Sequence, residues 1–200
     1  MSHPGKALAL RQEINVLLEK GAITTVDRQT QEGGFYSTYF VIPKKDGGLR
    51  PILDLRPLNA HLKVMKFHML RTVEVLQSIQ ENDWFTTIDL KDAYFHIPIA
   101  PHHRHFLRFA FEGQAYQFCV LPFGIALAPR VFTRCVAAAL GPLQAQGIRV
   151  LPYLDDWLIC SQSEAQARID TAAVVAHVSE LGLRVNHQKS SLIPSQKTVF

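Results

Sequence analysis

The alternation of hydrophobic and polar residues predicts helices and strands that interleave along the chain without a regular repeat. Apolar residues at helical spacing predict helices at 10–18, 70–79, 131–140 and 164–181. Apolar, β-branched and aromatic runs bounded by turn residues predict strands at 35–42, 49–55, 84–90, 106–111, 115–120 and 150–159, with shorter extended pieces at 96–99 and 183–185. Because the order lacks the regular strand–helix–strand alternation of a nucleotide-binding sheet, it favours an α+β fold.

Several residues mark expected boundaries and buried faces. Gly21, Gly141 and Gly182 follow apolar helical patterns, so each is expected to end a helix. Pro51 argues for an edge position of its strand. In the segment 70–79, Leu70, Val73, Leu76 and Ile79 recur at helical spacing and predict a helix.

The composition changes this picture only slightly. A hydrophobic content of 48% with 19% charged residues is globular, and a net charge of +4 is compatible with a polyanionic partner without requiring one. Cys119, Cys135 and Cys160 are odd in number and lie in apolar surroundings, so we expect buried thiols in a reducing compartment, cytoplasmic and/or nuclear. We expect neither a signal peptide nor a membrane contact.

The candidate chemistry centres on Asp155 and Asp156, two adjacent carboxylates inside the apolar run 150–159. Alone they are equally consistent with a solvated hairpin turn and with a divalent-metal site, where a cation offsets their repulsion. Asp89, at the end of another predicted strand, favours the metal site. If the two strands were neighbours, the three carboxylates could hold two metal ions about 3.5–4 Å apart, as in nucleotidyl transfer.

A basic hairpin supplies a second candidate site. Lys44 and Lys45 precede a predicted Asp-Gly turn, and Arg50 lies on the returning strand. Ammonium and guanidinium groups of this kind could hold a triphosphate, arginine by a bidentate contact.

Five segments in order resemble the motifs of retroelement reverse transcriptases, over about Leu10 to the last residue. They are Phe40–Asn59, Phe85–Ile99, Leu121–Pro129, Tyr153–Asp156 and Leu181–Lys189. Within this group, Trp157 and the sequence of the segment Phe40–Asn59, which resembles the fingers hairpin, are most similar to DIRS-like retrotransposons.

The resemblance implies the fingers and palm of a right-hand polymerase, with an antiparallel palm sheet packed on helices. The fingers are expected at about 1–83 and 100–124, and the palm at about 84–99 and 125–200. It also implies that residues 1–200 are a C-terminally truncated reverse transcriptase domain, with the thumb and any ribonuclease H domain absent.

The same resemblance implies roles for individual residues. Asp89, Asp155 and Asp156 would be metal ligands and catalytic acids, assisted by the Leu90 carbonyl, and Lys189 would protonate the leaving pyrophosphate. Tyr94 would exclude a 2′-hydroxyl by bulk. The other expected nucleotide contacts are Lys44, Lys45, Arg50, Ala93, Phe123 and Gly124, although Phe123 stands where retroviral relatives often carry glutamine.

The implied function is RNA-directed DNA synthesis, as part of a retrotransposon polyprotein. Deoxynucleoside triphosphates would be added to a DNA primer on an RNA or DNA template, with two Mg²⁺ ions or, alternatively, Mn²⁺; no oligomeric state is implied. Two other hypotheses stay open. One is an inactive or domesticated fragment that binds nucleic acid or a partner, and the other is a part of a polyprotein whose activity is ribonuclease H.

Overall fold

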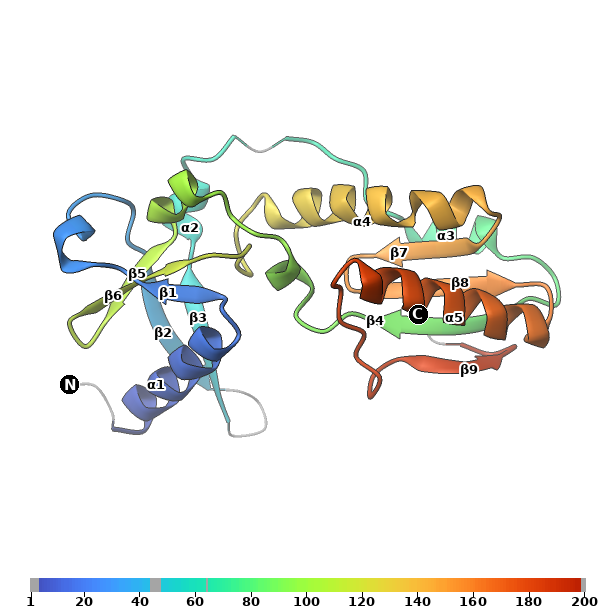
Figure 1. The fold of residues 1–200 in the computed structure, drawn as a ribbon, viewed down its shortest axis with the longest axis horizontal. Helices are drawn as coiled ribbons and strands as arrows, with labels where there is room; N and C mark the ends of the chain where they lie inside the picture. The colour runs from blue at the N-terminus through green and yellow to red at the C-terminus, as the bar shows by residue number, and fades with distance from the viewer. Residues whose placement is uncertain (1–3, 44–47, 64, 199–200) are drawn as a thin grey trace. The chain divides into compact units, whose positions relative to one another are not determined.

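The computed structural model describes residues 4–43, 48–63 and 65–198, which form two compact units of mixed helix and strand (Figure 1). Unit 1 consists of Met1–Val64 and Ile97–Ala128, and unit 2 of Met65–His96 and Pro129–Phe200. The α+β class predicted from the sequence is confirmed. Within the described part of the chain, no helix is both long enough and apolar enough to cross a membrane.

Unit 1 combines one long helix with two small antiparallel sheets. Its elements are α1 (Pro4–Glu19), β1 (Ile23–Thr25), η1 (Arg28–Thr30), β2 (Thr38–Pro43), β3 (Leu49–Asp54), α2 (Arg56–Asn59), η3 (Pro101–Phe106), β5 (Arg108–Phe111) and β6 (Gln114–Phe118). The strands form a three-stranded sheet, β1-β6-β5, and the hairpin β2-β3. Because β3 pairs only with β2, Pro51 lies on an edge strand, as expected.

The core of unit 1 lies between α1 and the strands. Leu10, Ile14 and Leu17 recur at helical spacing and are buried. The ring of Phe109 is fully buried and contacts the ring of Tyr39 at a centroid distance of 4.7 Å. Gly21 ends the helix as predicted, because its φ of +66° lets Ala22 N–H return to the Leu17 carbonyl at 2.9 Å.

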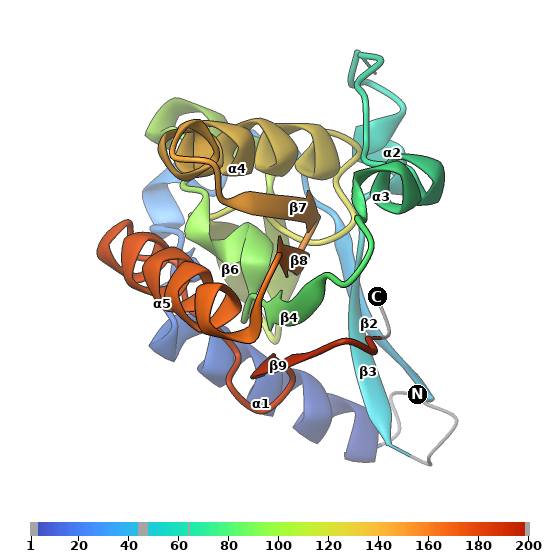
Figure 2. The same ribbon diagram turned by 90° about the vertical axis from the view of Figure 1, so that its right-hand side faces the viewer.

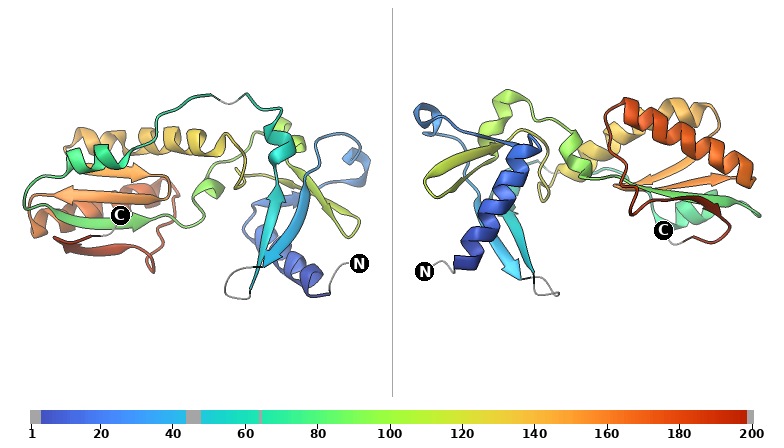
Figure 3. Two further views of the ribbon diagram at one scale, coloured as in Figure 1. Left: turned by 180° about the vertical axis from the view of Figure 1, so that it is seen from behind. Right: turned by 60° about the horizontal axis from the view of Figure 1, so that its bottom comes forward.

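Unit 2 is a four-stranded antiparallel sheet with helices on both faces (Figure 2). Its elements are α3 (Thr72–Ser78), β4 (Trp84–Asp89), η2 (Ala93–His96), α4 (Ala128–Ala145), β7 (Arg149–Tyr153), β8 (Asp156–Ser161), α5 (Glu164–Glu180) and β9 (Ser191–Ser195). The strand order is β7-β8-β4-β9, which puts β8 and β4 in the middle. Helices α4 and α5 lie on one face, and α3 lies on the other (Figure 3, left).

Strand β8 is buried along both faces, and successive side chains point to opposite sides. Leu158 and Cys160 pack against Val75 of α3. On the opposite face, Ser161 Oγ donates to the Asp170 carboxylate of α5 at 2.5 Å. The central strands are therefore held between two layers of helix.

Helix α4 runs past the glycine that was expected to end it. Gly141 lies inside the helix, followed by Pro142, so the expected end at Leu140 is wrong. The actual end is marked by Gly147, whose φ is +88° and beside which Ile148 N–H donates to the Leu143 carbonyl at 3.2 Å. A glycine ends a helix by adopting the left-handed conformation, and Gly141 does not adopt it.

The extent of the predicted helix at 70–79 and the burial of the cysteines also differ from the expectation. In α3, Val75 is buried whereas Val73 and Leu76 are 59% and 64% exposed. The helix spans only seven residues, so Leu70 and Ile79 lie outside it and the helical spacing does not continue through them. Of the three cysteines only Cys160 is buried, and Cys135 is exposed because it lies beside the buried stripe of α4 rather than on it.

The ends of the short extended segments differ from the expectation as well. His96 belongs to η2 rather than to an extended stretch, and Val185 forms an isolated bridge with Leu90. Strand β9 was not predicted, since its polar residues and Pro194 are typical of a turn. It forms because one edge of β4 is free to pair with it.

One end of the unit 2 sheet is held by a buried ion pair. The Asp83 side chain is fully buried and accepts from Arg149 Nη1 at 2.9 Å, from Gln80 N–H at 2.8 Å and from Gln162 Nε2 at 2.6 Å. Burial would raise the pKa of Asp83, but these hydrogen bonds and the Arg149 charge outweigh it and lower the pKa. The network joins the starts of β4 and β7 to the end of β8.

We expect Arg149→Ala to lower the free energy of unfolding by about 3 kcal/mol, because it leaves a buried carboxylate without its cation. Urea denaturation measures the change. Arg168→Ala is the matched control, since it removes an exposed pair with Glu164 that contributes about 0.5 kcal/mol. Equal losses in the two variants would contradict the structural role of the buried pair.

Candidate active site

The register of β4 and β8 places two predicted site residues side by side. Asp89 and Asp156 are cross-strand partners at the last pair of the ladder, directly after Ile88 and Trp157. Partners in an antiparallel ladder project to the same face of the sheet, with α-carbons about 4.5–5.5 Å apart. The two carboxylates therefore share one face at one end of the sheet.

The third carboxylate belongs to the tight turn between β7 and β8. Tyr153 pairs with Asp156, so Leu154 and Asp155 form a two-residue connection. Leu154 has a φ of +51°, which costs a non-glycine residue about 1–2 kcal/mol. Two contacts hold the turn in this conformation: Trp157 Nε1 donates to the Leu154 carbonyl at 2.8 Å, and Leu90 N–H donates to the Asp155 carbonyl at 2.8 Å.

The polar segment 186–190 is fastened to the same strand end. Asn186 N–H donates to the Asp89 carbonyl at 2.8 Å, and Asp89 N–H donates to Ser190 Oγ at 3.0 Å. Ser190 Oγ in turn donates to the Asn186 carbonyl at 2.8 Å. These bonds bring Lys189 to the carboxylates, although no pairing of this segment was visible in the sequence.

The charges of these groups act on one another. Partial burial and the negative charges of Asp155 and Asp89 raise the pKa of Asp156, and the Lys189 ammonium acts in the opposite direction. Burial and the charge of Asp155 raise the pKa of Tyr94, whose ring packs edge-on against Phe132 at 5.4 Å. The structure thus brings five predicted site residues of unit 2 into one electrostatic cluster.

The chemistry of this cluster fits a hard divalent cation, because carboxylate oxygens are the preferred ligands and a cation would relieve their repulsion. The carboxylate side chains themselves are not arranged as the ligands of a metal ion. Within the ranges that the structure describes, no three His, Cys, Asp or Glu side chains converge closely enough to hold a metal ion. The backbone therefore places the donors together, whereas metal coordination by them stays a prediction.

The remaining predicted contacts are distributed between the units. Ala93 is buried at the start of η2, and Leu90 is buried just beyond β4, both in unit 2. Arg50 lies on β3, opposite Ile42, and Phe123 and Gly124 follow β6, all in unit 1. Lys44 and Lys45 lie outside the described residues. Contact of these unit 1 residues with a nucleotide stays a prediction.

Asn59 holds the loop that carries Phe123 and Gly124. Its Nδ2 donates to the Gly124 carbonyl at 2.8 Å, and its Oδ1 accepts from Ala126 N–H at 2.8 Å. Gly124 has a φ of +93°, a conformation that other residues adopt only with strain. Asn59 is the last residue of the segment Phe40–Asn59 that resembles the family. Its contact with the Gly124 loop was not predictable from the sequence, because the two lie far apart along the chain.

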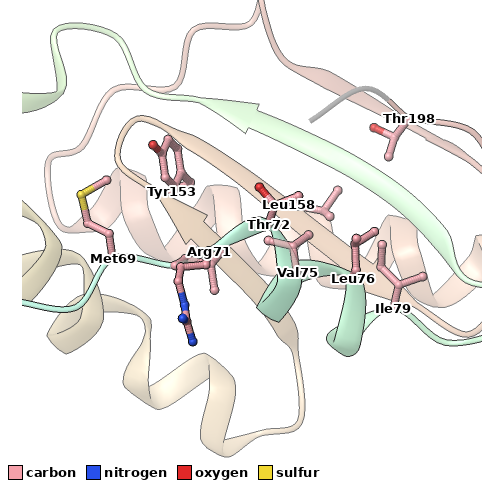
Figure 4. A pocket seen from close by; sticks show the side chains of 10 residues that line it. Met69, Arg71, Thr72, Val75, Leu76, Ile79, Tyr153, Leu158 and Thr198 are labelled. Carbon is pink, nitrogen blue, oxygen red and sulfur yellow. The ribbon is translucent and has the colours of Figure 1, made fainter.

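A separate apolar groove lies on the α3 side of unit 2 (Figure 4). It measures about 730 Å³ and is lined mainly by apolar side chains of the segment around α3, with Tyr153 and Leu158 from the sheet. Its only charged lining residue among those described is Arg71. Because it contains no carboxylate, this groove is not the metal-binding candidate.

Comparison with known proteins identifies the family. Residues 42–200 match the family described as "Reverse transcriptase (RNA-dependent DNA polymerase)". The chain is 33% identical over 193 residues to the Transposon Tf2-3 polyprotein of Schizosaccharomyces pombe, and 32% identical to the Tf2-7 polyprotein. These matches cover 96% of the chain but only 14% of each polyprotein. They leave the DIRS-like assignment a prediction.

Solved structures give the same fold. The prototype foamy virus protease–reverse transcriptase CSH mutant matches 96% of the chain and 24% of its own length, with a TM-score of 0.79 and 23% identity. The foamy viral protease–reverse transcriptase dRH, solved in complex with double-stranded DNA, matches 99% of the chain and 33% of its own length, with a TM-score of 0.82 and 22% identity. The architecture is therefore the fingers and palm of these polymerases. With its sequence matching the family over 42–200, the chain belongs to the reverse transcriptase (RNA-dependent DNA polymerase) family.

Proposed function

We propose that this chain performs template-directed addition of deoxynucleotides to a primer 3′-OH, with release of pyrophosphate. The observation that carries the proposal is the cross-strand pair Asp89–Asp156 with Asp155 in the adjoining turn. The charges of Asp155 and Asp89 raise the pKa of Asp156, so the three carboxylates repel one another. In a family of nucleotidyltransferases, such a cluster would serve to hold cations at the reacting phosphate.

The proposed domain assignment has the fingers at about 1–83 and 100–124 and the palm at about 84–99 and 125–200. By internal contacts, residues 65–83 belong with unit 2, together with the candidate palm. The chain spans about 14% of the length of the polyproteins it matches.

The proposed partners are an RNA or DNA template, a DNA primer and deoxynucleoside triphosphates. A foamy viral relative was solved with double-stranded DNA, and the Tf2 relatives are transposon polyproteins. The net charge of +4 is compatible with a polyanion.

The proposed cofactors are two Mg²⁺ ions, with Mn²⁺ as an alternative. Asp89, Asp155 and Asp156 would hold them, together with the Leu90 carbonyl. The chemistry that the bound ions would supply is positive charge at both the attacking and the leaving oxygen of an in-line displacement. The chain itself contributes a backbone link: the Leu90 N–H bond to the Asp155 carbonyl fastens the turn that carries Asp155 to the end of β4.

The proposed nucleotide contacts come from both units. Tyr94, at the turn after Asp89, would stack under the sugar, and the Ala93 and Tyr94 amides would face the triphosphate. Lys189 Nζ would donate a proton to the leaving pyrophosphate, which its influence on Asp156 supports. From unit 1, the proposed contacts are Lys44, Lys45, Arg50, Phe123 and Gly124.

We expect Asp155→Asn to lower primer extension at least about 100-fold, because it removes a charge at the reacting centre while preserving shape. The measurement is Mg²⁺-dependent extension of a DNA primer on an RNA template by the full-length protein. Asp27→Asn is the control, since an asparagine oxygen can still accept the Gln29 N–H bond that Asp27 accepts. Near-parental extension by Asp155→Asn would refute the proposal, and absence of extension by the parent would favour the inactive-fragment hypothesis.

Metal-free stability tests the carboxylate cluster without any assay of activity. A pKa raised by folding means that the ionised Asp156 destabilises the folded state, so the contribution of this one group to stability is fully present below its unfolded pKa and is lost as the pH rises through the raised pKa. In EDTA at neutral pH, Asp156→Asn should therefore unfold at a higher temperature than the parent.

Addition of Mg²⁺ should raise the melting temperature of the parent and change that of Asp156→Asn much less, because bound cations stabilise the folded state. Thermal unfolding followed by circular dichroism provides both measurements. Equal Mg²⁺ shifts in the two proteins would show that Asp156 does not take part in cation binding.

We expect Tyr94→Val to lower the preference for deoxynucleotides over ribonucleotides about tenfold or more, because the ring no longer crowds the 2′ position. The measurement is the ratio of kcat/KM for the two nucleotides. Tyr94→Phe is the control, since it keeps the bulk of the ring and removes only the hydroxyl. An unchanged ratio in Tyr94→Val would rule out this role.

A further inference from the structure

His96, the last residue of η2, uses both of its ring nitrogens. Nδ1 lies 3.1 Å from the Ala93 carbonyl oxygen, and Arg184 N–H donates to Nε2 at 3.1 Å. A carbonyl can only accept and a backbone N–H can only donate. The ring is therefore neutral, with its proton on Nδ1.

These two bonds connect segments that carry predicted site residues. On one side is the turn of Ala93 and Tyr94. On the other side is Arg184, whose carbonyl accepts from Lys91 N–H at 2.8 Å. From Arg184 the chain continues through Asn186, which donates to the Asp89 carbonyl, to Lys189.

Backbone bonds join the 184–190 segment to the end of β4, but the η2 turn is joined to that segment by the imidazole of His96. The imidazole therefore adds a side-chain link between η2 and this segment to the backbone bonds that Asp89 and Lys91 make with it. The loop between Asp89 and Ala93 includes Asp92, which has a φ of +52°.

We propose that His96 is a positioning residue, which ties the Ala93–Tyr94 turn to the Arg184–Lys189 segment and so sets the spacing between the nucleotide-binding turn and the proton donor. The inference rests on the proposed function, since it assigns His96 a part in that reaction. The two hydrogen bonds of the His96 ring go to the Ala93 carbonyl and the Arg184 N–H, so the proposed part of His96 in the reaction is indirect.

Amide hydrogen exchange at Arg184 tests the tie directly. In His96→Leu we expect the Arg184 amide to exchange about tenfold faster at neutral pH, because its acceptor is gone. In His96→Gln, Oε1 can accept at a position similar to Nε2, so most of the protection should remain. His187→Gln is the matched control, an exposed histidine in the same segment. Unchanged exchange in His96→Leu would overturn the tie, whatever the activity.

Kinetics of the full-length protein test the positioning role. We expect His96→Leu to lower kcat for primer extension about tenfold, with primer–template affinity unchanged, and His96→Gln to recover most of the loss.

Hydrogen exchange and kinetics together distinguish failure of the tie, of the positioning role and of the proposed function. Faster exchange in His96→Leu with parental kcat, or no recovery of kcat in His96→Gln, would overturn the positioning role. A parent without Mg²⁺-dependent extension would overturn the proposed function, and the positioning role with it, while the exchange data would still decide whether the tie exists.

Discussion

The antiparallel register of β4 and β8 is the constraint on which the candidate site depends. It sets Asp89 opposite Asp156, an arrangement that like charges oppose. A slip of one residue would turn Asp89 to the face of the sheet covered by α5 and would carry the Ile88 side chain to the other face. The buried side chains around it, among them Ile88 and Trp157, favour the observed register over such slips, because burying their apolar surface outweighs the repulsion of two partly solvated carboxylates.

The two ends of the same strands illustrate opposite uses of a carboxylate. At the start of β4, Asp83 is buried, paired with Arg149 and supplied with further donors, so its pKa is lowered. At the other end, Asp156 has two carboxylates for neighbours and its pKa is raised. Within the described ranges, no ion pair includes Asp89, Asp155 or Asp156. The paired end contributes stability, whereas the unpaired end retains negative charge that a cation can use.

Short polar contacts then bring the rest of the site to the unpaired end. Leu90 holds the Asp155 turn, Ser190 and Asn186 hold the segment of Lys189, and His96 joins that segment to the turn of Tyr94. The contacts of Leu90, Asn186 and Ser190 use backbone groups at the end of β4, and His96 uses the Arg184 N–H. The same bonds that complete the secondary structure therefore place the candidate catalytic groups.

The sequence by itself determined the element types, the α+β class and the acidic candidates, because periodicity and local turn chemistry are properties of neighbouring residues. Asp89 at a strand end and Asp155–Asp156 in a hairpin were predictable in this way, and so was the left-handed glycine after α1. What it could not determine was pairing between distant segments. Only the tertiary structure decided that Asp89 faces Asp156, that β9 pairs with β4, that Asn59 holds the Gly124 loop and that His96 accepts from Arg184. It also decided that α4 continues through Gly141 and that α3 buries Val75. The pairings and the burial of Val75 depend on partners far away along the chain, and local patterns carry no record of which partner that will be.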